Sequence, residues 1–306
     1  MDKLQNTAWI AVDWGTSNLR VWMMDHDGVA FASASSNKGM GSLAPQEFEA
    51  ALLELIEPHL HADCVTPVIC AGMVGAREGW IEAPYVATPC APPNGNDGVA
   101  PVVNDPRISV HILPGVKQVA SPDVMRGEET QIAGALSRNP DFDGILCLPG
   151  THTKWVHISA GEIVSFKTFM TGELFALLSE QSVLRHSVTD ETLDPKAFLD
   201  AVADTMSQPH AFASKLFGLR AAGLVGGAQP QHARARLSGM LVGLELGAAR
   251  PYWLGQQVAI LGAGPVGELY RVGLEEQGVP TAVWDVTDLT LVGLSKAYEA
   301  QKGSAA

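Results

Sequence analysis

Short hydrophobic runs separated by small and polar turn residues open the chain. Residues 8–13, 19–24 and 29–35 are rich in strand-forming side chains, and short turns at 15–18 and 25–28 lie between them. Runs of this kind bounded by Gly, Asp, Asn and Thr are typical of β-strands joined by hairpins. The pattern therefore predicts a three-stranded antiparallel meander at the start of the chain.

The same layout returns in the middle of the chain. Strands are predicted at 145–148, 154–159 and 163–169. The Gly-Thr pair at 15–16 aligns with the pair at 150–151, and Val21 aligns with Val156 at the same offset. Internal repetition indicates a duplicated structural unit. Chance similarity of two hairpins is the alternative, and the constant offset through turn and second strand counts against it.

Helical periodicity follows each meander. Helices are predicted at 45–61, 172–185, 195–219 and 231–249, and an irregular Gly- and Pro-rich loop is predicted at 88–106. The last helix carries Gly239, Gly243 and Gly247 on one face, which favours close helix packing. We expect two domains, the first over residues 1–120 and the second over residues 121–306.

Composition narrows the functional class. The chain has 306 residues, of which 46% are hydrophobic and 17% charged, as in ordinary globular enzymes of two domains. Its net charge of −13 argues against nucleic-acid binding, which needs clustered cations. The four cysteines show no metal-ligand spacing, and no signal peptide or membrane span is apparent. We expect a cytoplasmic enzyme with a small-molecule partner, and a homodimer stays open.

The Gly-Thr turns are candidate phosphate loops, because glycine lets the backbone approach an anion and successive N–H groups bind it. The first loop comprises Gly15, Thr16, Ser17 and Asn18, followed by Arg20 as a further cation. Asp13 ends the preceding strand and is the candidate ligand for a hydrated Mg²⁺. The second loop comprises Gly150, Thr151, His152, Thr153 and Lys154. It lacks a strand-end Asp, so we expect it to bind β- and γ-phosphates of ATP rather than metal. A plain hairpin turn is the alternative for each loop.

A glycine-rich turn near the end supports a rival hypothesis. A strand at 258–261 precedes Gly262, Ala263 and Gly264, and a helix, a second strand and Asp285 follow. This order matches the GxGxxG fingerprint of NAD-binding proteins. Only about 20 residues remain after it, too few for the further strands of a Rossmann half. An NAD-dependent oxidoreductase is kept as the less favoured alternative.

Four segments together resemble one protein family. AVDWGTSNLRVW, CAGMVGAREGW, RGEETQIAGAL and LPGTHTKWV resemble the 2-dehydro-3-deoxygalactonokinases of the sugar kinase, hsp70 and actin superfamily. The resemblance implies an α/β fold of two duplicated actin-like (ribonuclease H-like) domains with a nucleotide cleft between them. It implies ATP-dependent phosphorylation of the 6-hydroxyl of 2-dehydro-3-deoxy-D-galactonate in galactonate degradation. It also assigns Gly262, Ala263 and Gly264 to the adenosine of ATP.

Phosphoryl transfer to a hydroxyl needs a carboxylate that accepts the proton. Related sugar kinases carry Gly-Asp-Gln before the second meander, and here Gly127 matches the Gly and Glu128 the Asp. The longer Glu leaves open whether Glu128 or Glu129 is the base, and Glu128 is preferred. The alternative is that both only stabilise a helix N-terminus.

The loop at 71–80 is the candidate acceptor pocket, because the matching loop lines the sugar site in the related kinases. Arg77 can form two hydrogen bonds to a carboxylate, as a sugar acid requires. Glu78 is a candidate acceptor for sugar hydroxyls, Trp80 a cover for an apolar face, and Lys38 a weaker partner for the carboxylate. Another sugar or sugar-acid kinase fits these residues equally well, and a non-catalytic nucleotide sensor is the remaining alternative.

Overall fold

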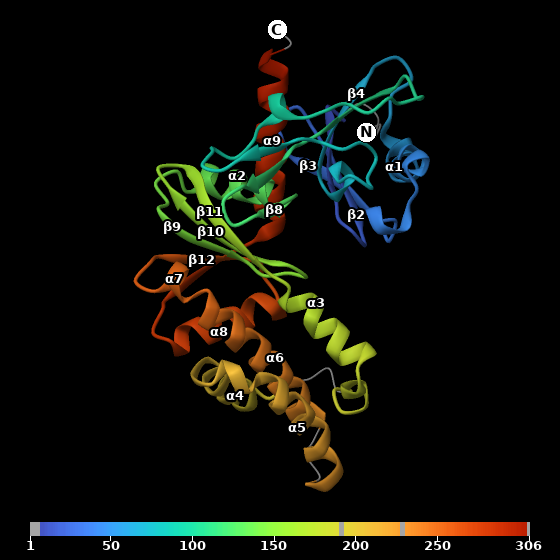
Figure 1. Cartoon of the computed structure of the whole chain (residues 1–306). Helices are drawn as coiled ribbons and strands as arrows, with labels where there is room; N and C mark the ends of the chain where they lie inside the picture. Colours follow the sequence, from blue (N-terminus) through green and yellow to red (C-terminus); the bar gives the residue numbers. More distant parts are fainter. Residues whose placement is uncertain (1–6, 190–192, 227–229, 305–306) are drawn as a thin grey trace. The chain divides into compact units, whose positions relative to one another are not determined.

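The computed structural model describes residues 7–189, 193–226 and 230–304 (Figure 1). It divides into two compact units, each described here by itself. The first unit contains the chain up to residue 142, a short piece at 160–164, and the chain from residue 286 onward. The second unit contains residues 143–159 and 165–285.

The first unit is built on a mixed sheet in the order β3-β2-β1-β4-β6. Its strands are β1 (Trp9–Trp14), β2 (Leu19–Met24), β3 (Ala30–Ser36), β4 (Thr66–Gly72) and β6 (Ile108–Ile112). Strands β1, β2 and β3 pair antiparallel, which confirms the predicted meander, whereas β4 and β6 continue the sheet in parallel with β1. A smaller sheet comprises β5 (Tyr85–Ala87), β7 (Gly115–Gln118) and β8 (Asp123–Met125).

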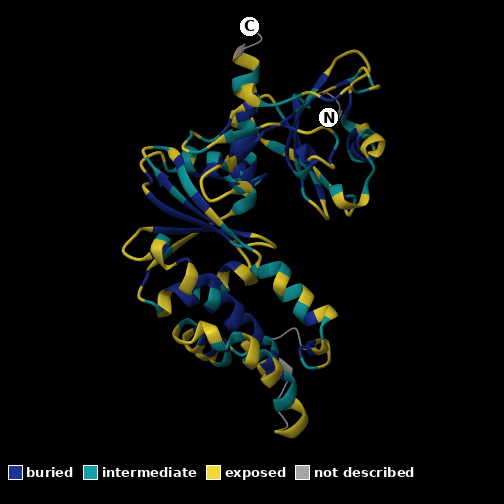
Figure 2. Ribbon diagram, in the orientation of Figure 1, coloured by how far each residue is buried: buried dark blue, intermediate teal, exposed yellow. Residues whose placement is uncertain are grey.

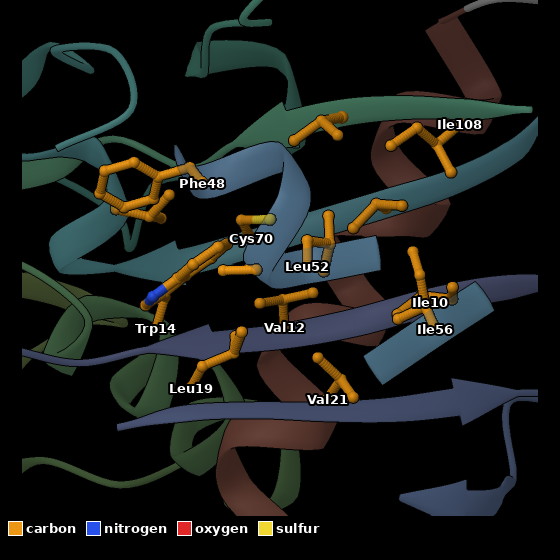
Figure 3. Packing of buried hydrophobic residues seen from close by; sticks show 14 of the residues in the cluster. Ile10, Val12, Trp14, Leu19, Val21, Phe48, Leu52, Ile56, Cys70 and Ile108 are labelled. Atoms are coloured by element: carbon orange, nitrogen blue, oxygen red, sulfur yellow. The ribbon is translucent and has the colours of Figure 1, made fainter. Parts of the chain in front are cut away.

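Helices cover both faces of this sheet. The helices of the first unit are α1 (Phe48–Ile56), α2 (Glu128–Arg138) and α9 (Val286–Ser304). Alternate residues of β1 point to opposite faces, so Ile10 and Val12 pack with Leu52 of α1 (Figure 3), while Trp9 packs with Leu294 of α9. A strand buried on both faces reads as a continuous apolar run, which is how β1 appears in the sequence.

The C-terminal helix belongs to the first unit, although the sequence analysis assigned residues 121–306 to the second domain. Leu294 and Ala297 of α9 fill the face of the first sheet opposite α1. Helix α2 packs against α9 so closely that a side chain at Gly134 or Gly293 would collide with the backbone of the other helix. Burial of an otherwise exposed sheet face is the physical reason for this division.

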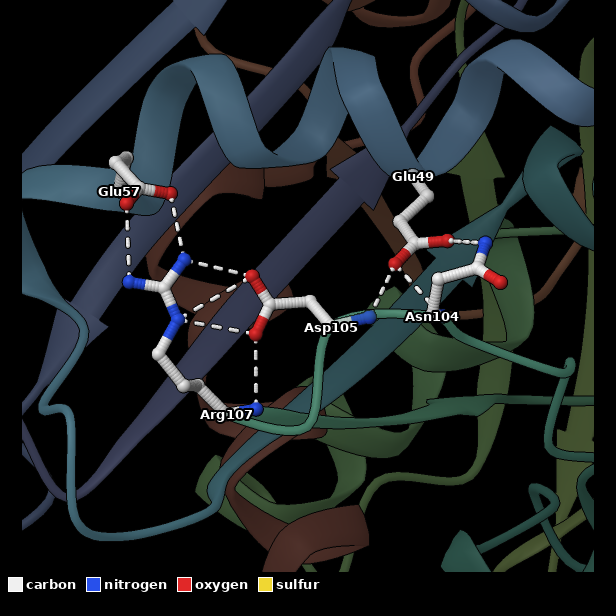
Figure 4. A network of polar contacts seen from close by, with 5 residues as sticks. All are labelled: Glu49, Glu57, Asn104, Asp105 and Arg107. Atoms are coloured by element: carbon white, nitrogen blue, oxygen red, sulfur yellow. Dashed lines mark hydrogen bonds and ion pairs between the residues drawn. The ribbon is translucent and has the colours of Figure 1, made fainter.

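A polar network ties the end of α1 to the segment before β6 (Figure 4). The guanidinium of Arg107 bonds both carboxylate oxygens of Glu57, at 3.0 and 2.9 Å, and also contacts Asp105. Glu49 accepts from the backbone N–H groups of Asn104 and Asp105 at 2.8 and 2.7 Å. These bonds hold the connection to β6 against α1.

The second unit repeats the sheet of the first. Its order is β11-β10-β9-β12-β13, with β9 and β10 antiparallel and β9, β12 and β13 parallel. The strands are β9 (Gly144–Leu148), β10 (Thr153–Ser159), β11 (Glu162–Phe169), β12 (Val258–Leu261) and β13 (Thr281–Trp284). The predicted duplication is confirmed. Trp14 pairs with Leu19 and Leu148 with Lys154, so the second hairpin turn is one residue longer and Cys147 takes the place of Asp13.

Six helices accompany the second sheet: α3 (Thr171–Ala176), α4 (Pro195–Ser207), α5 (Phe212–Val225), α6 (Pro230–Ala248), α7 (Arg250–Trp253) and α8 (Pro265–Glu276) within the part of the chain that is described. The prediction of one helix over 195–219 is wrong. Pro209 lacks an N–H and restricts Gln208, so α4 ends and α5 starts after a short turn. The predicted small face of α6 is confirmed, because side chains at Gly239 or Gly243 would collide with the backbone of α4.

Buried residues concentrate in the five-stranded sheet of each unit, whose central strands are largely dark in Figure 2. All four cysteines are free thiols, and Cys70 and Cys147 are buried in the strands. Over the described ranges, no helix is both long enough and apolar enough to cross a membrane.

Candidate active site

Asp13 lies at the carboxyl end of β1, directly opposite Arg20 of β2. The two side chains form an ion pair through Arg20 Nη2 and Asp13 Oδ2. The Asp13 side chain is 15% exposed, whereas that of Arg20 is 42% exposed and also lies over the ring of Trp22. Arg20 therefore neutralises Asp13, and this pairing is a contact that the sequence analysis did not expect.

The first Gly-Thr turn is fixed by its backbone and open at its side chains. The N–H of Gly15 donates to the carbonyl oxygen of Asn18 at 2.9 Å, and Gly41 donates to Thr16 at 2.9 Å. A side chain at Gly39 would collide with the backbone of residues 16–18, so two segments pack without side chains between them. Thr16, Ser17 and Asn18 are exposed. The loop is rigidly held while its hydroxyl groups face solvent, as phosphate binding would require.

Gly72 brings three elements of the first unit together at the carboxyl ends of β1 and β4. Its φ is +97°, and a Cβ there would lie 2.6 Å from the carbonyl oxygen of Trp14 and 3.5 Å from Oδ1 of Asp13. On its other side, a Cβ at Gly127 would lie 3.2 Å from the Cα of Gly72. The metal candidate, the acceptor loop and the start of α2 therefore meet around one glycine. Open parallel sheets bind ligands at this edge.

Substitution of Gly72 by alanine is expected to destabilise the first unit by about 1–3 kcal/mol, because the residue needs a left-handed backbone and has no room for a Cβ. A fall of several degrees in Tm would be measured by thermal unfolding. Gly218 of α5 is the matched control, since a Cβ there meets no atom within 4 Å and alanine favours a helix. Equal Tm values for Gly72→Ala and the wild type would contradict the expectation.

The side chains of both candidate bases accept hydrogen bonds from backbone N–H groups just before α2. Glu128 is half-buried, and its Oε2 accepts from the backbone N–H of Arg126 at 3.0 Å. Glu129 is 1% exposed, and both its oxygens accept from the N–H of Gly127 at 2.8 Å. Burial, with the neighbouring Glu128 charge second, raises the pKa of Glu129 to about 8. Glu129 is therefore neutral at pH 7, and of the two acids Glu128 is the one with access to solvent.

Arg126 joins the acceptor loop to α2, and the sequence analysis overlooked it. Its side chain is buried, Nη2 donates to the carbonyl oxygen of Ala83 at 2.8 Å, and the guanidinium lies 4.2 Å from the ring centroid of Tyr85. A Cβ at Gly75 would lie 2.9 Å from Nη1. The glycine thus leaves room for the guanidinium, which holds the loop at a fixed distance from Glu128.

The predicted acceptor residues differ in how they are presented. Arg77 has 80% of its side chain exposed and lies 3.8 Å from Glu82, and Glu78 is exposed as well. Trp80 is half-buried and packs on Phe48 and Trp14, with ring centroids 6.1 and 6.3 Å away.

Lys38 is the fourth predicted acceptor residue, and its ammonium is already paired. Nζ donates to both carboxylate oxygens of Glu54, at 2.6 and 2.7 Å. Its backbone carbonyl oxygen accepts from Nε1 of Trp14 at 2.9 Å, which places the residue beside the first loop. Arg77 and Glu78 therefore keep exposed polar groups, whereas Trp80 and Lys38 are engaged with the protein.

The second Gly-Thr turn, in the second unit, exposes only some of the five residues predicted to bind phosphate. Gly150, Thr151 and His152 are exposed, and a Cβ at Gly150 would meet no atom within 4 Å. Thr153 is fully buried and its Oγ1 lies 3.0 Å from the hydroxyl of Tyr270. Lys154 is 5% exposed, with Nζ 3.5 Å from the carbonyl oxygen of His152. Thr153 and Lys154 are therefore buried beside the turn, where they contact Gly150 and His152.

His152 has a partner that the sequence analysis did not consider. Its Nε2 lies 2.5 Å from Oε2 of Glu173, near the start of α3. The N–H of Glu173 also donates to the carbonyl oxygen of Thr151 at 3.0 Å. The carboxylate of Glu173 therefore lies at the turn and holds His152.

The glycine-rich turn lies next to the second Gly-Thr turn, because β9 and β12 are parallel neighbours. A Cβ at Gly262 would come within 3.9 Å of Pro149, and one at Gly264 would meet nothing within 4 Å. Gly264 has φ +126° and precedes α8, whose Gly267 touches the backbone of Gly262. Strand β13 is the edge strand of the sheet, and the helix that follows it, α9, belongs to the first unit. The further strands that a dinucleotide-binding fold needs therefore do not follow β13.

The residues around Asp13 fit a magnesium ion that keeps most of its water. No group of three or more His, Cys, Asp or Glu side chains gathers as a metal site in the described ranges. Mg²⁺ is commonly held by one or two carboxylates plus waters and phosphates. Because Gly72 has no side chain, nothing from that residue covers Oδ1 of Asp13, to which a Cβ would come within 3.5 Å. A single carboxylate that is partly exposed suits the hydrated ion.

Comparison with known proteins finds relatives over most of the chain. The family model described as 2-keto-3-deoxy-galactonokinase matches residues 13–297. A protein of Rhizobium meliloti (strain 1021) named as a 2-dehydro-3-deoxygalactonokinase is 39% identical over 95% of this chain and 96% of its own. The 2-dehydro-3-deoxygalactonokinase of Escherichia coli (strain K12) is 33% identical over 84% of this chain and 85% of its own.

Solved structures extend the comparison to the fold. A crystal structure from Sinorhizobium meliloti, titled as a protein of the same kinase type, superposes with a TM-score of 0.87 at 39% identity, over 95% of this chain and 96% of that one. A ligand-bound xylulose kinase from Lactobacillus acidophilus shares the fold alone, with a TM-score of 0.50 at 11% identity over 96% and 89%. The predicted actin-like sugar kinase fold is confirmed, and the chain belongs to the 2-keto-3-deoxy-galactonokinase family.

Proposed function

We propose that the protein transfers the γ-phosphoryl group of ATP to the 6-hydroxyl of 2-dehydro-3-deoxy-D-galactonate. The observation that carries this proposal is the identity of 39% and 33%, over most of the chain, to two proteins named for that activity. Membership of a kinase family makes the protein a phosphotransferase with an alcohol acceptor and ATP as co-substrate. The cytoplasm, where ATP is made, is the expected location.

The proposed roles divide between the two units. In the first unit, Asp13 would hold a hydrated Mg²⁺, and the exposed groups of residues 15–18 would bind phosphate oxygens. In the second unit, the turn at 150–152 would bind the β- and γ-phosphates, and Gly262 to Gly264 would contact adenosine. When bound, Mg²⁺ supplies positive charge that offsets the charge of the phosphates.

The proposed chemical step is a displacement at phosphorus. The 6-hydroxyl oxygen forms a bond to the γ-phosphorus as the bond from that phosphorus to the bridging oxygen breaks, and ADP leaves. The hydroxyl proton passes to the carboxylate of Glu128. Glu128 is supported as base over Glu129 by its partial exposure and by the raised pKa of its buried neighbour. Arg20, now paired with Asp13, would be released toward phosphate once the metal neutralises that carboxylate.

We assign acceptor recognition to the loop that follows Gly72. The exposed guanidinium of Arg77 would bind the sugar-acid carboxylate through two hydrogen bonds, and Glu78 would accept from sugar hydroxyls. Trp80 would support the pocket through its contact with Trp14 rather than cover the sugar directly. Lys38 is the weaker candidate, because Glu54 already binds its ammonium.

An ADP-release screen across six-carbon 2-keto-3-deoxy acids tests the substrate. The galactonate is expected to react with a kcat/KM at least about tenfold above that of its gluconate epimer, since a hydrogen bond to one substrate hydroxyl that is lost once the bound substrate excludes water costs about 1–3 kcal/mol. Equal rates on both epimers would widen the proposal to a general sugar-acid kinase. No turnover of any sugar acid would reject it.

The oxidoreductase alternative is tested by ligand protection against thermal unfolding. Mg·ATP is expected to raise the Tm and NADH to leave it unchanged, because a ligand that binds only the folded state stabilises it. Protection by NADH without protection by Mg·ATP would favour the dinucleotide hypothesis for the glycine-rich turn.

A further inference from the structure

One buried acid of the second unit has no part in the proposed chemistry. Glu245 of α6 is 2% exposed and interrupts an otherwise apolar run from Met240 to Leu246. Burial raises its pKa to about 7, against the hydrogen bonds it accepts, which lower the pKa. Removing a carboxylate from water costs several kcal/mol, and an apolar residue of similar size would often stabilise a core as well or better. The acid therefore calls for a reason other than stability.

Three donors from three different elements converge on this carboxylate. Nε1 of Trp155 in β10 donates at 2.7 Å, and the hydroxyl of Tyr270 in α8 donates at 2.7 Å. The hydroxyl of Thr171, the first residue of α3, donates to Oε2. Trp155 and Tyr270 are buried and Thr171 is partly buried, so the shared carboxylate links β10, α8 and α3 at one point.

Two routes lead from Glu245 to the second Gly-Thr turn. On the first route, the hydroxyl of Tyr270 lies 3.0 Å from Oγ1 of Thr153, which in turn accepts from the N–H of Gly150 at 3.5 Å. Thr153 has no exposed surface, so its hydroxyl is positioned by the protein alone.

On the second route, Thr171 anchors the start of α3. The next residue, Gly172, has no room for a Cβ against the backbone of Gly150 and Thr151. Glu173 then donates its N–H to the carbonyl oxygen of Thr151 at 3.0 Å. The turn is therefore braced from both ends by elements that share one carboxylate.

We infer that Glu245 is a positioning residue that holds residues 150–153 in the conformation that binds the phosphates of ATP. The inference rests on the proposed function, which assigns phosphate to this turn. The carboxylate does not touch the nucleotide. It acts through Tyr270 and Thr171, and its two oxygens accept from three donors on three elements.

Replacement of Glu245 by leucine tests this role. The variant should unfold at a lower Tm than the wild type, because the N–H of Trp155 and the hydroxyl of Tyr270 lose their buried acceptor, so its kinetics are measured below that temperature. Its KM for ATP should rise about tenfold to a hundredfold, as expected when a binding loop moves by about 1 Å. The KM for the sugar acid, whose proposed residues lie in the first unit, should stay within about twofold. Glu245→Gln keeps one acceptor oxygen and should recover part of the ATP affinity.

Further variants make the test decisive. Tyr270→Phe and Thr171→Val each cut one route and should each raise the KM for ATP by less than Glu245→Leu, so the inference is testable even if the leucine variant does not fold. Ser159→Ala is the matched control, because it removes a hydrogen bond of 2.7 Å to Asp143 at the far end of β10. It should leave the KM for ATP unchanged.

Thermal protection by Mg·ATP distinguishes the two ways of being wrong. If the wild type is protected and a folded Glu245→Leu, Tyr270→Phe and Thr171→Val are protected equally, the positioning role is refuted while the kinase proposal stands. If the wild type itself gains no protection from Mg·ATP, the proposed function fails and this role fails with it.

Discussion

Glu128→Gln is expected to lower kcat by about 10²–10⁴-fold, the range that a positioned general base contributes. The amide matches the carboxylate in shape and can still accept from the N–H of Arg126, which now lies 3.0 Å from Oε2. It cannot take up the proton of the acceptor hydroxyl. The fold and the affinity for Mg·ATP should therefore persist. Steady-state kinetics with both substrates, and thermal protection by Mg·ATP, measure the two properties separately.

Glu129→Gln is the matched control on the adjacent residue. Because the pKa of Glu129 is about 8, its side chain is mostly protonated at pH 7, and glutamine imitates that neutral form. Turnover at pH 7 is expected to stay within a few-fold of the wild type. A large loss in Glu129→Gln together with near-normal turnover in Glu128→Gln would reverse the assignment of the base.

The pH dependence of stability checks the protonation of Glu129 independently of activity. The folded pKa of about 8 lies above the ordinary value of 4.5, so the folded chain binds this proton more tightly than the unfolded chain. The stabilisation is complete below about pH 4.5 and is lost as the pH rises through 8, at about 1.4 kcal/mol per pH unit in that window. Glu129→Gln should lack this contribution between pH 7 and 8 in urea unfolding curves, and an unchanged slope would place Glu129 among ordinary carboxylates.

Much of the fold was accessible from the sequence because it rests on local patterns. The strands of both meanders, the Gly-Thr turns and the strand before the glycine-rich turn are short runs with their own turn residues, and all appear in the structure. The helix predicted over 195–219 failed on a local feature, since Pro209 within it was overlooked. A proline in a helical pattern is a readable stop signal.

The remaining errors concern contacts between distant parts of the chain. Nothing near α9 indicates that Leu294 will cover the sheet containing Trp9, so the predicted domain boundary differs from the observed division. The ion pairs of Lys38 with Glu54 and of His152 with Glu173 are likewise set by packing. Glu245 did leave a signal, as a charge within an apolar helix, but its three donors come from separate elements.

The candidate site shows the same division between local and distant information. Asp13 and the residues of the first turn are recognisable from a strand end followed by Gly-Thr-Ser. The approach of this strand end to the start of α2 depends on Gly72, which has one neighbour in β1 and another in Gly127. Only a residue without a side chain allows both approaches, and the sequence does not name the partners of a glycine. The list of candidate groups was therefore obtainable, while their mutual arrangement was not.

Asp13→Asn is expected to lower turnover by about two orders of magnitude, the scale on which loss of a metal-supporting group reduces activity. Asparagine keeps the shape of the side chain but removes the charge that would attract a hydrated Mg²⁺ and that now neutralises Arg20. The freed guanidinium should attract ATP by itself. We therefore expect thermal protection by ATP to require Mg²⁺ in the wild type and to be nearly the same with Mg²⁺ or EDTA in the variant.

Asp25→Asn is the matched control for Asp13→Asn, because Asp25 is also an acid at the end of a strand in this meander. Its Oδ1 accepts from the backbone N–H groups of Asp27 and Val29, at 2.9 and 2.8 Å, and an amide oxygen can do the same. Turnover and Mg²⁺ dependence should therefore match the wild type. A wild-type Mg²⁺ dependence of ATP protection in Asp13→Asn would show that the ion is held elsewhere. Asp13 would then be only the structural partner of Arg20, and the role of the first loop would rest on its backbone and hydroxyl groups alone.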